Sequence, residues 1–86
     1  MKTIMLLMAQ YEAKAVIQAD VVCRDYFPHL TPDKFIRKVS LGEIKLPLLR
    51  MESSQKTAKG IHIEDLANYL DKVRASAVKE AEQMSA

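Results

Sequence analysis

Positively charged side chains gather in the middle of this 86-residue chain, and their spacing puts several of them on one side of a helix. Lys34, Arg37 and Lys38 stand three and four residues apart within TPDKFIRKVSL (residues 31–41). Residues 31–62 hold seven Lys/Arg and three Asp/Glu, which gives a net charge of +4. The rest of the chain holds six Lys/Arg and eight Asp/Glu, which gives a net charge of −2. Ammonium and guanidinium groups in such a row can hydrogen-bond to the oxygens of a polyanion.

A polar segment, SSQKTAKG (residues 53–60), adds hydroxyl, amide and amine groups, which are the usual contacts to phosphate and to the minor groove. Arg37 is the best candidate base reader, because its planar fork matches guanine O6 and N7. The lysines more often reach phosphates. The other interpretations are a solvated amphipathic helix and an ordinary polar loop. The full set of candidate DNA contacts is Thr31, Lys34, Arg37, Lys38, Lys45, Arg50, Ser53, Ser54, Gln55, Lys56 and Lys59.

Two short helices are expected to position the basic row. Val22 and Tyr26, like Cys23 and Phe27, are four residues apart, which predicts a helix over residues 19–27 that ends before Pro28. Thr31 and Pro32 then form a helix start, since the threonine side chain can cap free N–H groups and proline suits the first position. This second helix should run from Pro32 to about Leu41 and stop at Gly42. Its buried side is predicted to be Phe35, Ile36 and Val39.

A hairpin should follow the basic helix. Pro47 cannot donate in a ladder, so the strand is predicted over residues 48–52, with residues 61–63 returning antiparallel after an eight-residue tip. A helix-turn-helix with a basic hairpin beside it favours double-stranded DNA as the partner. The fold class is therefore predicted as α+β, a small winged helix-turn-helix with a two-stranded β-hairpin wing and a C-terminal helix.

The two ends of the chain are expected to support this piece. Residues 1–11 are apolar and predict core, either as a helix from Ile4 capped by Thr3 or as a strand; residues 15–17 predict a short extended piece. A last helix should begin near residues 63–64 and reach about residue 81, with residues 82–86 frayed. Its apolar stripe should pack on the core at first, and further on it is a dimer seam, a partner contact or a solvated tail. The stripe consists of Leu66, Leu70, Val73, Ala77 and, more weakly, Ala81.

Composition and motifs narrow the function classes. The length allows a single domain over residues 1–86. One cysteine, Cys23, permits no intrachain disulfide and fits a reducing, cytoplasmic setting. The apolar run of residues 4–9 is too short to span a bilayer and makes a poor signal peptide. His29 and His62 lack partners at metal-ligand spacing, and no Gly-rich phosphate loop or nucleophile motif occurs, so neither a metal, a cofactor nor an enzyme is expected.

Several segments together resemble a known family. The order of helices and hairpin, followed by Asp65-Leu66 and Tyr69-Leu70, is similar to excisionase-like and MerR-like winged helices, where these pairs pack back on the core. More narrowly, the chain resembles the pyocin activator protein (PrtN-like) family up to about Ala77. The segments that carry this resemblance are LLMAQY (6–11), VCRDYF (22–27), HLTPDKFIRKV (29–39), GEIKLPL (42–48), and SQK followed by GIHI.

The resemblance implies a nucleoid-associated transcriptional activator of prophage or phage-tail-like bacteriocin genes that recognises short promoter-proximal repeats. RNA polymerase or a recombinase would then be a protein partner, and a homodimer could form through the C-terminal helix. Two other hypotheses are an excisionase-like factor that bends DNA, and a protein-interaction module that blocks a host enzyme through the C-terminal helix.

Overall fold

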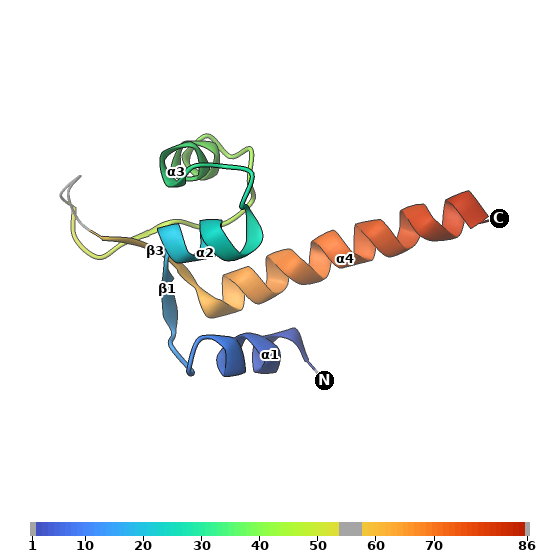
Figure 1. Ribbon diagram of the computed structural model, residues 1–86, viewed down its shortest axis with the longest axis horizontal. Helices are drawn as coiled ribbons and strands as arrows, with labels where there is room; N and C mark the ends of the chain where they lie inside the picture. Colours follow the sequence, from blue (N-terminus) through green and yellow to red (C-terminus); the bar gives the residue numbers. More distant parts are fainter. Residues whose placement is uncertain (1, 54–57, 86) are drawn as a thin grey trace.

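A computed structural model describes residues 2–53 and 58–85 of the chain. This part forms a small α+β structure of four helices and one short sheet (Figure 1). The elements follow the order α1 (Thr3–Gln10), β1 (Val16–Gln18), α2 (Ala19–Tyr26), α3 (Pro32–Ser40), β2 (Leu49–Arg50), β3 (Lys59–His62) and α4 (Ile63–Ser85).

The sheet has three antiparallel strands in the order β1-β3-β2, one more than the two-stranded hairpin predicted from the sequence. Gly60 of β3 lies opposite Gln18 of β1 in the antiparallel ladder. A Cβ atom there would lie 2.5 Å from Val16 Cγ1 and 3.1 Å from the Ile17 carbonyl oxygen, so a larger residue would force the strands apart. The predicted strand bounds were partly wrong: β2 is shorter than residues 48–52, and β3 begins at Lys59 rather than at residue 61.

The helix pair α2–α3 agrees with the sequence prediction. The Phe27 N–H donates to the Cys23 carbonyl oxygen (2.8 Å) and ends α2 before Pro28. Thr31 caps α3, because its Oγ1 accepts from the Lys34 N–H at 3.3 Å. The helix ends at Ser40, and Gly42 follows with a φ of +78°, a left-handed conformation that favours glycine.

Replacement of Thr31 by alanine is expected to lower the free energy of unfolding by about 1 kcal/mol, because one N–H group of the first turn of α3 loses its acceptor. Chemical denaturation with circular dichroism measures the change. Thr31→Ser keeps the hydroxyl and serves as the control. Equal stabilities for the alanine and serine variants would show that the cap contributes nothing.

The core lies between the sheet, α2, α3 and the first half of α4. Phe35 of α3 is fully buried, and its ring centroid lies 4.8 Å from that of Phe27. The ring centroid of Phe27 in turn lies 5.9 Å from that of Tyr69 in α4. Ile36, predicted to be buried, is only half-buried at the edge of this cluster. The buried residues are Leu7, Tyr11, Ile17, Ala19, Val22, Cys23, Phe27, Phe35, Val39, Ile44, Leu46, Ile61, Ile63, Leu66 and Ala67.

Helix α1 is less buried than the sequence predicted. The helical alternative for residues 1–11 is confirmed, but Lys2 rather than Thr3 is the N-cap residue, and the Thr3 hydroxyl instead donates to Asp71 Oδ1 at 2.5 Å. Only one side of α1 faces α4, so Leu7 is buried while the other side stays exposed. The prediction of a core segment was therefore wrong for Met5, Leu6 and Met8, all of which are exposed.

Helix α4 follows β3 without any connecting residue, since the strand ends at His62 and the helix begins at Ile63. His62 Nδ1 accepts the Glu64 N–H at 3.1 Å, and the acidic side chains of the first turn suit the helix dipole. Leu66 is buried, as predicted, whereas every residue from 71 to 85 is exposed. The helix continues to Ser85, so the predicted fraying after residue 81 was wrong.

Candidate nucleic-acid interface

The basic row of α3 lies on a helix that packs on α2 at one edge of the molecule (Figure 1). Phe35 and Val39 anchor this helix, and Lys34 and Arg37 are exposed on its other side. Lys38 is half-buried, because its position on the helix lies closer to the line of Phe35 than the position of Arg37 does. The row predicted from spacing therefore exists, with Arg37 and Lys34 as its most accessible members.

The strand register brings two further cations together. Arg50 of β2 lies directly opposite Lys59 of β3 in the antiparallel ladder. Like charges in opposite positions destabilise a strand pair, and an anion bound between them would remove that cost. Ser53 is exposed just beyond β2. The predicted contacts Ser54, Gln55 and Lys56 lie outside the described residues.

A hollow joins the α3 side to the sheet side of this surface. It has a volume of about 310 Å³ and lies between Ile36 of α3, the start of α2 and the beginning of β3. Lys59 lies on its wall, and Asp20 of α2 brings one negative charge to the same hollow. Of the described candidate contacts, Lys59 lines this hollow, whereas Lys34, Arg37 and Arg50 are not part of its lining. We call the basic side chains of α3 and of the β2–β3 pair the cationic strip.

The basic side chains of this strip have no acidic partner among the residues that the structure describes. The ion pair found in that part of the chain lies on α2, where Arg24 Nε is 3.0 Å from Asp25 Oδ1. Lys34, Arg37, Arg50 and Lys59 therefore keep their charge available to an external anion. Thr31 is exposed at the start of α3, but its hydroxyl already accepts the capping bond.

Lys45 lies apart from the rest of the predicted set. Its amine is the nearest group to Gly42, where a Cβ atom would lie 3.9 Å from Lys45 Nζ. The lysine thus reaches back to the C-terminal end of α3, where the helix dipole favours a positive charge. Its side chain also lines a hollow against α4 rather than the one beside Lys59.

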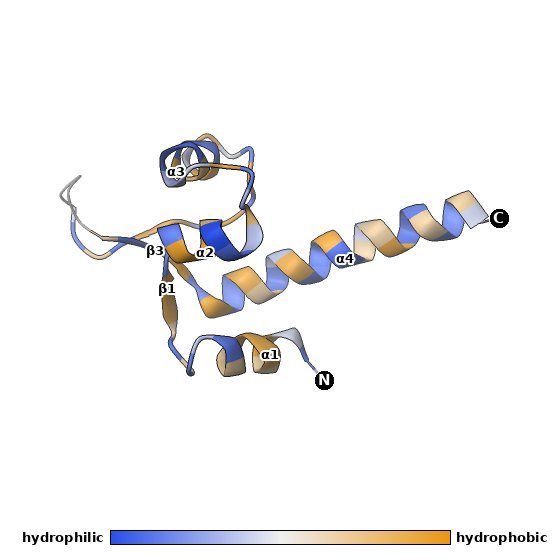
Figure 2. Cartoon of the chain, viewed as in Figure 1, coloured by the Kyte–Doolittle hydropathy of each residue, from blue (hydrophilic) through white to orange (hydrophobic). Residues whose placement is uncertain are grey.

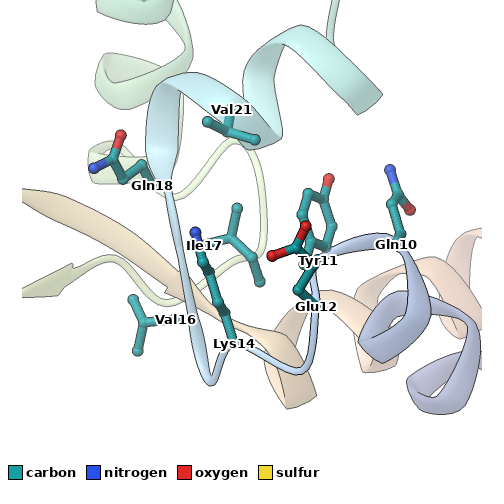
Figure 3. Close-up of a pocket in the computed structure, with 8 residues that line it drawn as sticks. All are labelled: Gln10, Tyr11, Glu12, Lys14, Val16, Ile17, Gln18 and Val21. Carbon is teal, nitrogen blue, oxygen red and sulfur yellow. The ribbon is translucent and has the colours of Figure 1, made fainter.

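A further hollow of about 370 Å³ lies where the connection from α1 to β1 meets α2 (Figure 3). The Tyr11 hydroxyl donates to Asp25 Oδ2 at 2.6 Å, and that of Tyr26 donates to Gln10 Oε1 at 2.7 Å. Burial, and then the bond to Asp25, raise the pKa of Tyr11. The pKa of Asp25 is lowered, first by the Tyr11 hydroxyl and then by Arg24. The neutral phenol of Tyr11 donates to the ionised carboxylate of Asp25, and this hydrogen bond connects the end of α1 to α2.

The sequence did not predict the hydrogen bond between Tyr11 and Asp25, the cap that His62 provides, or the third strand of the sheet. The two histidines make local contacts. The His29 ring lies at 44° to that of Phe27, with the ring centroids 6.3 Å apart, and His62 caps α4. Cys23 is a core residue, as its apolar helix face predicted. Within residues 2–53 and 58–85, no three His, Cys, Asp or Glu side chains form a group that could hold a metal ion. None of the helices described is both long and apolar enough to cross a bilayer.

The basic helix, the paired strands and the long terminal helix define a small α+β protein with one cationic strip. The family model of the pyocin activator protein PrtN matches residues 3–77, and the chain belongs to this family. The family takes its name from an activator protein. Comparisons with curated proteins and with solved structures gave no match.

Proposed function

We propose that this protein is a sequence-specific DNA-binding activator of prophage or phage-tail-like bacteriocin genes. Membership of the pyocin activator protein family supports the regulatory role. The observation that supports the DNA-binding mode is the cationic strip, whose basic side chains on α3 and in the Arg50–Lys59 pair have no acidic partner among the described residues. Such a protein would act in the cytoplasm, at the nucleoid, and residues 1–86 would form its single DNA-binding domain.

In this proposal α2, α3 and the β2–β3 hairpin act as a winged helix-turn-helix. Helix α3 would lie in the major groove, with Arg37 reading a base edge and Lys34 and Lys38 contacting phosphates. The hairpin would hold flanking backbone or the minor groove through Arg50, Lys59 and its tip, which includes Ser53, Ser54, Gln55 and Lys56. Lys45 would contribute only if its amine leaves the end of α3. RNA polymerase would be the protein partner of an activator, and a recombinase that of a bending factor.

Selection of bound sequences from a random DNA pool, followed by a salt titration of the best site, tests the proposal. Binding should weaken steeply as salt rises, because each neutralised phosphate releases counterions. Lys59→Ala should weaken binding to all sequences about equally and reduce the slope of log K against log salt by about 1. Lys14→Ala, in the exposed connection between α1 and β1, is the matched control and should leave the slope unchanged.

The absence of salt-dependent binding to any selected sequence would overturn the proposal. A selected site that is bent on binding but drives no reporter gene would instead favour the excisionase-like role. An equal loss of slope for Lys59→Ala and Lys14→Ala would remove the sheet from the proposed interface.

A further inference from the structure

The second half of α4 extends beyond the rest of the molecule (Figure 1). All fifteen residues from 71 to 85 are exposed, although the same helix is buried at Leu66. Apart from the hydrogen bond of Asp71 with Thr3 at its first residue, this part of the helix is exposed. It therefore gains little of the packing that supplies most helical stability in proteins. We call residues 71–85 the distal segment.

An apolar stripe runs from the core onto the distal segment. At 3.6 residues per turn, Leu66, Leu70, Val73, Ala77, Ala81 and Met84 fall within about 80° of one another around the helix axis. Leu66 and Leu70 pack against the core, whereas Val73 and Met84 are 50% and 88% exposed. Figure 2 shows apolar bands continuing along the helix to its end. The face that is covered in the first half of α4 is thus uncovered in the second half.

The exposed surface is larger than a compact chain of this mass requires. The described structure has an accessible area of 6469 Å², against about 5,100 Å² expected for a compact 9.7 kDa monomer. Its radius of gyration is 14.3 Å, against about 12 Å expected for a compact chain of 86 residues. The excess of about 1,300 Å² exceeds the roughly 800 Å² that each partner contributes to a standard interface.

A hollow beside the apolar stripe lies where the distal segment begins to extend beyond the domain. It has a volume of about 410 Å³ and opens between the α3–β2 connection and α4. Tyr69, Val73 and Ala77 form its apolar part, and Lys45, Lys72, Ser76 and Glu80 complete its lining. The stripe and the hollow form one continuous surface.

We propose that a second copy of this chain covers the stripe, with the distal segments of the two protomers packed against each other. The charges of the segment favour this occupant. Lys72, Arg74 and Lys79 balance Asp71, Glu80 and Glu82, so the segment is neutral and carries both signs along its length. A two-fold interface requires such a self-complementary surface, whereas DNA or a strongly charged protein would require an excess of one sign.

Sedimentation equilibrium of the full chain without DNA tests the seam, using Ala77→Glu and the matched variant Ala75→Glu. Both positions are exposed on the same helix, but Ala77 lies on the stripe and Ala75 on the opposite face. Wild type should dimerise, and Ala77→Glu should raise the dissociation constant at least about tenfold, because the interface would bury an unpaired carboxylate. Ala75→Glu should dimerise like wild type, and circular dichroism should give equal helix contents for all three.

A wild-type chain that stays monomeric into the millimolar range would overturn this inference, and so would equal weakening by the two variants. The measurement contains no DNA, so its result does not depend on the proposed regulatory function. Conversely, a failure of DNA binding would leave the dimer result unchanged.

Discussion

Replacement of Phe35 by alanine is expected to lower the free energy of unfolding by about 3–5 kcal/mol, because the loss of a large aromatic side chain leaves a cavity in a closely packed core. The ring is fully buried, and its packing against Phe27 at 4.8 Å connects α3 to α2 and, through Tyr69, to α4. A domain of this size has a total stability of only about 5–15 kcal/mol, so the variant should be largely unfolded at modest denaturant concentrations.

Urea denaturation followed by circular dichroism measures this loss. Ile36→Ala is the matched control, because Ile36 is the next residue of the same helix but only half-buried. The free energy of unfolding should fall clearly less in this variant, since fewer atoms leave an apolar environment. If both variants lose the same stability, the assignment of Phe35 as the residue that anchors the basic helix is wrong.

Replacement of Arg37 by alanine is expected to weaken binding to the selected DNA site by roughly 1–3 kcal/mol and to relax the preference at one base pair. Arg37 is exposed and has no acidic partner among the described residues, so its removal should leave the fold intact. Fluorescence anisotropy at fixed salt, with the selected site and with point-substituted sites, measures both effects.

Arg37→Lys separates the two roles of this side chain. Lysine keeps the charge but lacks the planar fork, so this variant should bind non-specific DNA as wild type does and still lose base preference. Unchanged affinity and preference in Arg37→Ala would remove Arg37 from the proposed contacts. Loss of affinity without loss of preference would make it a phosphate contact instead.

Local signals in the sequence predicted the helix pair well. Thr31-Pro32 and Gly42 determine where α3 begins and ends through neighbouring backbone groups, and the four-residue spacing of Cys23 and Phe27 reports one face of α2. These features depend on contacts within a few residues. The exposure of Lys34 and Arg37 followed from the same periodicity, because Phe35 and Val39 occupy the buried side.

Features that depend on distant partners could not be read from the chain. The pairing of β1 with β3 joins Val16 to His62, and nothing in three residues of strand indicates a partner so far along the sequence. Likewise, the apolar run of α1 does not show that only one of its sides meets α4, so the sequence predicts core where Met5, Leu6 and Met8 are exposed. The sequence also did not show that the Lys45 amine lies near Gly42, at the end of α3.

The direct passage from β3 into α4 has a mechanical consequence. β3 is the central strand, hydrogen-bonded to both neighbours, and it continues into a helix of 23 residues with no loop between them. Strand and helix therefore behave as one stiff rod, about 34 Å of which is helix at 1.5 Å per residue. Two hydrogen bonds oppose a hinge at this joint, since His62 Nδ1 accepts the Glu64 N–H and the Ala15 carbonyl oxygen accepts the Ile63 N–H. We therefore expect a tilt of the hairpin to displace Ser85 at the far end of the helix.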